Sequence, residues 1–248
     1  MSDQITAGTI TIKGAGGDPI EAYLATPDEP TPGGSMVVLH HMPGYDRATK
    51  EITRRFAAEL GYTAICPNLH FREAPGAAPD DAAAASRAAG GVPDERLIGD
   101  VEGALTYLRG LDSSNGKVGV IGYCSGGRQA FLAATSLALD AAIDCYGAFV
   151  VRRPPEGLSW NVGPIGDRAA TLNCPLLGLF GVEDSNPTPA EVEELAQALK
   201  MNDKEYEFHS FENAGHAFFS TDRPAYRQQA AVEGWEIIDA FLARILSV

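Results

Sequence analysis

The fold is decided by the stretch Val118-Gly119-Val120-Ile121-Gly122-Tyr123-Cys124-Ser125-Gly126-Gly127. A short apolar run, typical of a buried strand, is followed at once by a cysteine between two glycines and then by a helical pattern. This order matches the strand–Gly-x-nucleophile-x-Gly–helix pattern, with Cys in the place that Ser more often takes. Gly122 and Gly126 suit the pattern, because a nucleophile on so tight a turn leaves no room for side chains two residues away. We therefore predict that Cys124 is a nucleophile, that the helix N-terminus favours its thiolate, and that the Ser125 amide faces a developing oxyanion.

Strands and helices alternate on both sides of this motif. The predicted strands are Met36–His40, Thr63–Pro67, Lys117–Ile121, Ala142–Cys145, Leu176–Phe180 and Tyr206–Phe211. The predicted helices are Ala48–Leu60, Pro93–Arg109, residues 126–138, Pro189–Met201 and Ala225–Leu246. A hairpin is expected at Thr9–Lys13 and Glu21–Thr26, and a short surface helix or lid at Ala82–Ala89. Such alternation predicts the α/β class and one domain over residues 1–248 with an α/β-hydrolase fold, in which a mostly parallel central sheet carries helices on both faces.

The nucleophile needs a histidine and an acid, which in this fold follow it along the chain with the acid first. Only His209 and His216 come after the cysteine. His209 lies inside a predicted strand, whereas His216 lies in a loop just past that strand, at the edge where open parallel sheets place their sites. The acid should follow the strand Leu176–Phe180, where Glu183 and Asp184 both occur. The place in the loop favours Asp184, with Glu183 as the alternative.

The composition limits the classes of partner. The 248 residues carry 33 acidic and 19 basic side chains, a net charge of −14, so no basic footprint for nucleic acid or an anionic membrane surface is present. No stretch of about 18 apolar residues predicts a membrane span, and no basic start followed by an apolar run predicts a signal peptide. The expected partner is a small molecule bound by a monomer or homodimer. Any anionic substrate would need a local positive group.

The other cysteines are expected to be inert. Cys66, Cys145 and Cys174 lie in or beside apolar segments, and none forms a Cys-x-x-Cys pair. A core of this size needs no disulfide, so a reducing, cytoplasmic location is the simplest interpretation.

Several stretches together resemble the dienelactone hydrolases, also called carboxymethylenebutenolidases, over about residues 10 to 246. The stretches are Ser114–Gly127, Gly215–Phe218, Cys66–Arg72, Asp144–Gly147 and Gly181–Asp184. The resemblance implies an α/β-hydrolase fold and a Cys–His–Asp triad at Cys124, His216 and Asp184. It also implies a second oxyanion donor, the amide of Met42, and a substrate-carboxylate contact at Arg72.

The sequence departs from that family at two places. His41 stands where the dienelactone enzymes have a glutamate thought to help deprotonate the thiol, and Ser220 stands where they have a second carboxylate-binding arginine. Arg223, three residues further, is a candidate substitute. His41 and Tyr123, the residue before the nucleophile, are expected to contact the substrate.

Three histidines raise the question of a metal. His40 and His41 could approach an ion together with His70, but adjacent residues on a strand point in opposite directions, so at most one of the two could share a site with His70. A packed or gating histidine is the favoured interpretation, and no metal or organic cofactor is expected.

The predicted function is the hydrolysis of lactones or activated esters through a thioester on Cys124, with His216 as acid and base. A general short-chain carboxylesterase is the main alternative. Two further classes stay open, a thiol redox protein, for which Cys66 or Cys145 would have to fold near the nucleophile, and a non-catalytic binding module.

Overall fold

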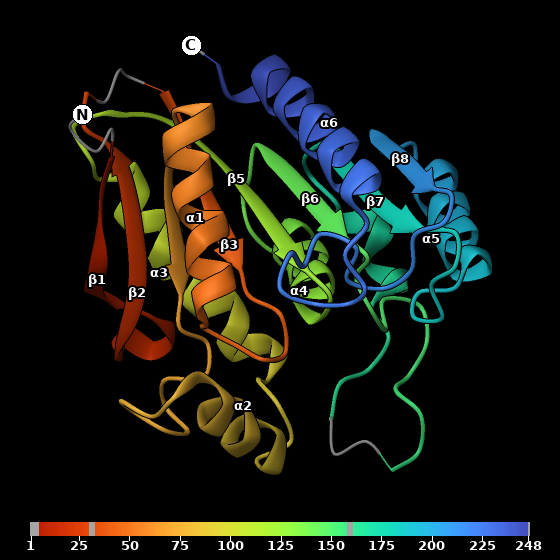
Figure 1. Ribbon diagram of the computed structural model, residues 1–248, viewed down its shortest axis with the longest axis horizontal. Coiled ribbons are helices and arrows are strands. Elements are labelled where there is room, and N and C mark those ends of the chain that lie inside the picture. Colours follow the sequence, from red (N-terminus) through yellow and green to blue (C-terminus); the bar gives the residue numbers. More distant parts are fainter. Residues whose placement is uncertain (1–4, 30–32, 158–160, 248) are drawn as a thin grey trace.

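The computed structural model describes residues 5–29, 33–157 and 161–247. Its centre is a sheet of eight strands in the order β1-β2-β4-β3-β5-β6-β7-β8 (Figure 1). The strands are β1 (Ile5–Lys13), β2 (Pro19–Pro27), β3 (Gly33–Leu39), β4 (Thr63–Pro67), β5 (Ser114–Tyr123), β6 (Ala141–Cys145), β7 (Leu176–Gly181) and β8 (Tyr206–Phe211). Strands β1, β2 and β4 pair antiparallel, and every pair from β4 to β8 is parallel. The predicted mostly parallel sheet and α/β-hydrolase fold are confirmed.

Helices cover both faces of the sheet (Figure 1). They are α1 (Arg47–Leu60), α2 (Pro79–Ala88), α3 (Asp94–Arg109), α4 (Ser125–Ala134), α5 (Pro189–Met201) and α6 (Gln228–Leu246), with short 3-10 turns at η1 (Ala15–Gly17) and η2 (Gly166–Thr171). The short helix expected in the alanine-rich stretch is therefore present as α2, and none of the predicted strands or helices is missing. No helix in the described part of the chain is both long and apolar enough to cross a membrane.

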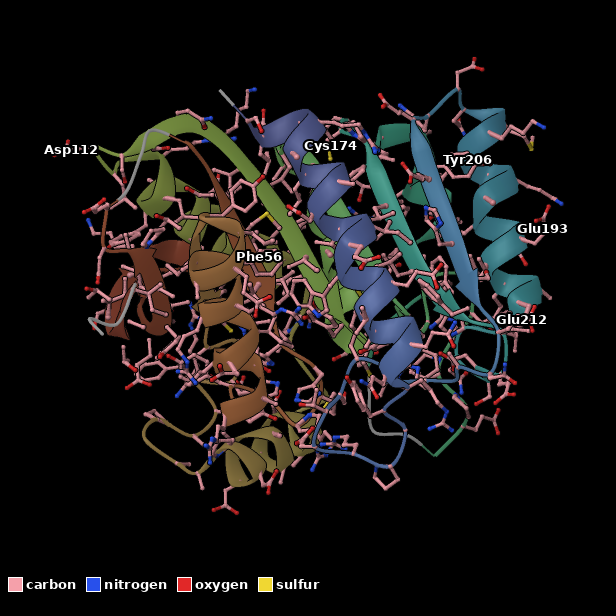
Figure 2. The ribbon with its side chains drawn as sticks, turned by 45° about the horizontal axis from the view of Figure 1, so that its top comes forward. Phe56, Asp112, Cys174, Glu193, Tyr206 and Glu212 are labelled. Atoms are coloured by element: carbon pink, nitrogen blue, oxygen red, sulfur yellow. The ribbon has the colours of Figure 1, made fainter. Side chains whose placement is uncertain are left out.

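Two hydrophobic cores explain why the helices divide between the faces. One core joins α3, α4 and α5 to the sheet through residues such as Phe131 and Leu195, and the other joins α1 and α6 through Phe56 and Trp235. Because both faces of the central strands are covered, Val118–Tyr123 of β5 and the whole of β6, Asp144 included, are buried without alternation. Figure 2 shows Phe56 on α1 in the interior of the molecule and the exposed Glu193 on α5 at its right-hand edge.

The parallel strands bring their carboxyl ends to one edge of the sheet. The turns that follow β3, β5, β7 and β8 therefore lie close together in space although they are far apart in the sequence. These four turns contain the residues from which the candidate site is built.

Candidate active site

Cys124 lies on the sharp turn between β5 and α4. Its φ of 58° and ψ of −120° lie in a region that L-residues rarely adopt. The turn is crowded, because a Cβ on Gly122 would come within 1.8 Å of the Gly126 carbonyl oxygen, and a Cβ on Gly126 within 2.3 Å of the Leu39 carbonyl oxygen. The two glycines are thus required by close backbone approach, and the strained turn leaves the half-buried cysteine at the N-terminus of α4.

His216 lies between Asp184 and Cys124. Its Nδ1 is 2.9 Å from Oδ2 of Asp184, whose side chain is fully buried and whose Oδ1 accepts a 2.8 Å hydrogen bond from the Asn186 amide. Burial alone would lower the pKa of His216, but hydrogen bonds with Asp184 and Cys124 outweigh it and raise the pKa to about 10. Glu183 is exposed, so the structure brings Asp184 and not Glu183 to the histidine.

The loop after β3 is held by an internal network. Nδ1 of His40 lies 2.9 Å from the His41 carbonyl oxygen and must donate to it, while Nε2 accepts from the Leu69 amide at 3.2 Å. The two bonds fix a neutral tautomer, and burial lowers the pKa of His40 to about 4. The Gly44 amide donates to the same His41 carbonyl at 2.9 Å. His41 and Met42 share one peptide plane, so holding this carbonyl also fixes the direction of the Met42 N–H.

The two amides expected to bind an oxyanion have no internal acceptor. No hydrogen bond within the described residues is donated by the Met42 or the Ser125 backbone N–H. Both residues are partly exposed. The two donors are therefore available to a bound molecule.

His41 does not share a site with His70. Its Nε2 lies 2.6 Å from Oδ2 of Asp46, whose other oxygen accepts from the Thr49 amide and so caps α1. His70 instead packs edge-on against His40, with ring centroids 4.6 Å apart. Within residues 5–29, 33–157 and 161–247, no group of three or more His, Cys, Asp or Glu side chains is placed to hold a metal ion.

Arg72 is placed differently from the expected carboxylate contact. Both of its terminal nitrogens donate at 2.9 Å to Asp100, whose side chain is completely buried, and its Nε donates to Asp18. The guanidinium therefore compensates a buried carboxylate and is not free for a substrate. Arg223, the candidate substitute, is exposed.

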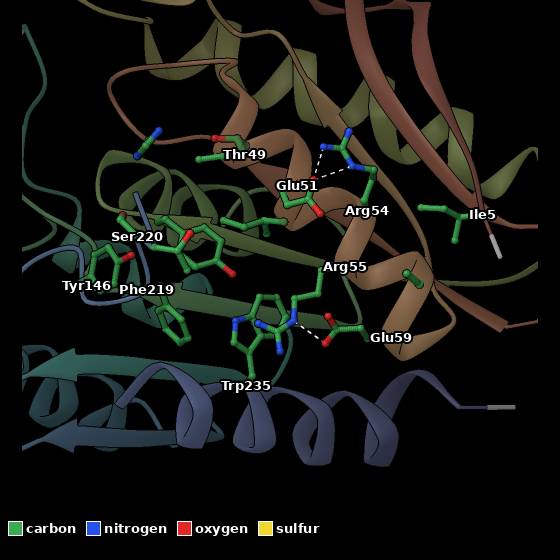
Figure 3. A pocket seen from close by; sticks show the side chains of 16 residues that line it. Ile5, Thr49, Glu51, Arg54, Arg55, Glu59, Tyr146, Phe219, Ser220 and Trp235 are labelled. Atoms are coloured by element: carbon green, nitrogen blue, oxygen red, sulfur yellow. Dashed lines mark hydrogen bonds and ion pairs between the residues drawn. The ribbon is translucent and has the colours of Figure 1, made fainter. Parts of the chain in front are cut away.

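A cavity of about 370 Å³ adjoins the triad between α1 and α6 (Figure 3). His41 and Tyr123, both expected at the substrate site, line it. Tyr146, which sequence analysis did not assign to the site, lines it as well, and its ring lies 5.2 Å from that of His216. Tyr146 follows β6 at the same edge of the sheet as the triad, which is the signal that could have identified it. Cys124 and His216 are not lining residues, so the cavity adjoins these two side chains and does not enclose them.

The other thiols are poorly suited to react. Cys66 and Cys145 are fully buried, and burial raises the pKa of each well above its usual value. Cys174 is also buried. Cys124 is thus the one partly exposed thiol among the chain's four cysteines, all of which are described.

The strand order and the strained strand–turn–helix at Cys124 define a hydrolase of the α/β-hydrolase fold. The chain belongs to the dienelactone hydrolase family, whose model matches residues 20–246. The prediction of a dienelactone hydrolase-like enzyme, of the class that hydrolyses carboxylic esters and lactones, is confirmed at this level.

Individual relatives agree with that family. A carboxymethylenebutenolidase of Pseudomonas putida is 30% identical over 243 residues, covering 96% of this chain and 97% of that protein. The crystal structure of a "Putative Dienelactone Hydrolase" from Klebsiella pneumoniae is 28% identical with a TM-score of 0.84, covering 97% of this chain and 99% of that chain. A dienelactone hydrolase-like promiscuous phosphotriesterase from metagenomic libraries shares the fold at 18% identity, with a TM-score of 0.77 and coverage of 99% and 100%.

Proposed function

We propose that this protein hydrolyses lactones or activated esters, with Cys124 as nucleophile, His216 as acid and base, and Asp184 as the group that orients His216. One observation carries the proposal. Nδ1 of His216 lies 2.9 Å from Oδ2 of Asp184, and the interactions of His216 with Asp184 and Cys124 outweigh burial and raise its pKa to about 10. A proton held on this imidazole at neutral pH favours a thiolate beside it, and the thiolate is the reactive form of cysteine.

The first half of the reaction forms a thioester. The Cys124 thiolate attacks the carbonyl carbon, and the carbonyl π electrons move to oxygen, where the Met42 and Ser125 amides stabilise the oxyanion. When the tetrahedral intermediate collapses, the bond to the leaving oxygen breaks and His216 gives that oxygen its proton. The acyl group then remains on sulfur, and His216 is neutral.

The second half returns the enzyme to its starting state. Neutral His216 takes a proton from water, whose oxygen attacks the thioester carbonyl. The second tetrahedral intermediate expels the Cys124 thiolate beside the protonated His216, and the carboxylic acid leaves. Throughout, Asp184 stabilises the positive charge on the ring and holds Nε2 toward the sulfur.

The nucleophile limits the substrate class. A thiolate is itself a good leaving group, so the first intermediate reverts unless the other group leaves easily. Enol lactones and aryl esters meet this condition, whereas amides do not. We therefore expect negligible peptidase activity.

The test is a comparison of wild type with Cys124→Ala on cis-dienelactone and on 4-nitrophenyl acetate. Turnover of every substrate that wild type hydrolyses should disappear in the variant, while rapid-quench mass spectrometry of wild type should detect one added acyl group on the Cys124 peptide. Retained turnover in a folded Cys124→Ala protein would refute the mechanism. Hydrolysis of the simple ester alone would favour the general carboxylesterase.

A further inference from the structure

The cavity beside the proposed triad is a passage between two helices. Figure 3 shows Tyr146, Phe219 and Ser220 gathered at one end, Trp235 in the middle, and Ile5 and Glu59 toward the other end. Tyr146 contacts His216, so the first end is the one next to the reacting groups. A volume of about 370 Å³ falls within the range of small-molecule sites.

One face of α1 forms the length of this passage. Ala48, Ile52, Arg55 and Glu59 all line it, at the three- and four-residue spacing that places side chains in a row. The eleven steps from Ala48 to Glu59, at about 1.5 Å each, give a row of about 16 Å. The row is longer than a small acyl group needs, so most of the wall lies away from the reacting carbonyl.

The opposite wall is aromatic. Trp235 of α6 packs against Phe219, with their ring centroids 6.1 Å apart. Tyr123 and Tyr146 extend the aromatic surface toward the reacting end and lie 6.2 Å apart. Such a surface binds an apolar group by excluding water from it.

The charged groups along the passage are compensated within the protein. Arg54 is paired with Glu51, Nε of Arg55 donates to Glu59 at 2.7 Å, and His41 is paired with Asp46. The Arg55 guanidinium also lies 4.1 Å from the centre of the Trp235 ring. No lining residue in the described part of the chain therefore offers an uncompensated positive charge, and residues 1–4, 30–32, 158–160 and 248 contain no Lys or Arg.

From this arrangement we infer that the passage binds the acyl group of the substrate, and that this group is uncharged and apolar, such as a medium-length alkyl chain or an aryl ring. The inference rests on the proposed function. We assign the acyl group, and not the leaving group, to the passage because of the residues at its reacting end. There His41 directly precedes the proposed oxyanion donor Met42, and Tyr123 directly precedes the proposed nucleophile Cys124. A carboxylate on the acyl group would have two possible environments. It would either displace Glu51 from Arg54 or Glu59 from Arg55, or remain unpaired beside aromatic rings, and either outcome costs binding free energy.

The direct test measures kcat/KM for 4-nitrophenyl acetate, butanoate, hexanoate and octanoate, together with the mono-4-nitrophenyl ester of adipic acid. The last has the hexanoate chain length but ends in a carboxylate. We expect kcat/KM to rise about fourfold with each buried methylene, hence about 250-fold over the four methylenes from acetate to hexanoate, and to fall about a hundredfold from hexanoate to the adipate ester. A flat series, or an adipate ester hydrolysed as fast as the hexanoate, would overturn the inference.

A second test locates the acyl group on α1. Ile52→Trp should block the middle of the passage and lower the hexanoate-to-acetate ratio of kcat/KM at least about tenfold. The matched control is Val232→Trp, which adds the same bulk on the solvent side of α6, where Val232 is 50% exposed. The control should leave the ratio unchanged. A ratio within one protein is independent of the folded fraction, so an unaltered ratio in Ile52→Trp contradicts the inference even if that variant is destabilised.

The two proposals fail in different ways. Hydrolysis of every ester in the series should vanish in Cys124→Ala if the thioester mechanism holds. If turnover persists there, the proposed function is wrong. If turnover vanishes there but the chain-length series is flat, only the assignment of the passage is wrong.

Discussion

Two histidine–aspartate pairs lie beside the same cavity. They differ in which group donates a hydrogen bond to the aspartate oxygen that does not contact the histidine. In the pair His216–Asp184, the second oxygen accepts a hydrogen bond from the Asn186 amide, which lies in the same loop as Asp184. This bond holds the carboxylate in position to contact His216. In the pair His41–Asp46, the second oxygen accepts from the Thr49 amide and so caps α1. The first carboxylate is completely buried, and the side chain of the second is 19% exposed.

The electrostatics of the pairs follow from these contacts. Hydrogen bonds with Asp184 and Cys124 overcome burial and raise the pKa of His216 to about 10. Burial would raise the pKa of Asp46, but hydrogen bonds from His41 and Thr49 outweigh it and lower the pKa to about 2. The same two residue types thus hold a proton near a thiol in one case and anchor a helix and a loop in the other. In the proposed mechanism, the neighbour of the histidine decides which pair moves a proton, and the pair itself does not.

The largest expected effect separates the two histidines. His216→Ala should lower kcat for 4-nitrophenyl acetate by roughly four to six orders of magnitude, because it removes the group proposed to transfer the proton. His41→Ala should lower it about tenfold at most, because it loosens a loop but removes no reacting group. Steady-state kinetics on both purified variants measures these changes in kcat. Comparable losses of kcat in the two variants would show that the two histidine–aspartate pairs do not differ in the way proposed.

A smaller effect on kcat should distinguish the role of the His41 backbone carbonyl from that of the His41 side chain. His40→Asn keeps an N–H near the position of Nδ1 and can still donate to that carbonyl, whereas His40→Gln keeps an acceptor near Nε2 for the Leu69 amide and loses the bond to the carbonyl. If the carbonyl fixes the Met42 N–H, His40→Gln should lower kcat about tenfold or more with little change in KM, and His40→Asn should restore most of it.

The control for this pair is the unfolding free energy measured in urea. A purely structural role for His40 would make the loss of kcat follow the loss of stability in both variants. Equal kcat values in the two variants would show that the carbonyl bond does not orient the Met42 amide.

The smallest expected effect is on the free energy of unfolding. The contributions of the two histidine–aspartate pairs to this free energy should depend on pH in opposite ways. The pKa of Asp46 falls from 3.8 to about 2 on folding, so its stabilisation is complete above pH 3.8 and is lost as the pH drops toward 2. The pKa of His216 rises from 6.5 to about 10, so its stabilisation is complete below pH 6.5 and is lost as the pH climbs through about 10. Urea unfolding across pH 2 to 10 should therefore show the gap between wild type and Asp46→Asn closing at acid pH, and the gap to His216→Gln closing at alkaline pH. A gap that closes at the other end would reverse the assignment.

The fold could be predicted from the sequence because its elements are local. Apolar runs such as Lys117–Ile121 predicted buried strands, and the glycines around Cys124 predicted the turn, since both depend on neighbours in the chain. The placement of His216 followed from the end of a strand. The sequence favoured Asp184 over Glu183 from its place in the loop, and the structure adds the burial and direction that separate these two adjacent carboxylates.

What could not be predicted depends on partners distant in the sequence. Arg72 was expected to meet a substrate, but its partner Asp100 lies 28 residues away on α3, and no pattern in the chain shows that this carboxylate is buried. Tyr146 touches the ring of His216, 70 positions further along the chain, and its contact arises from the order of the strands in the sheet. The partner of His41 was missed even though Asp46 is only five residues away, because the intervening loop turns back on itself.

In this protein the groups proposed to react and the wall proposed to select the substrate lie on different elements. Substrate range can therefore change by mutation while the proposed reacting groups stay the same. The proposed reacting groups follow β5, β7 and β8, whereas much of the cavity wall comes from α1. A mutant library confined to Ala48, Ile52 and Ala58 changes none of the groups proposed to react, whereas any side chain at Gly122 meets backbone. Selection for new esters should therefore enrich substitutions along a single face of one helix.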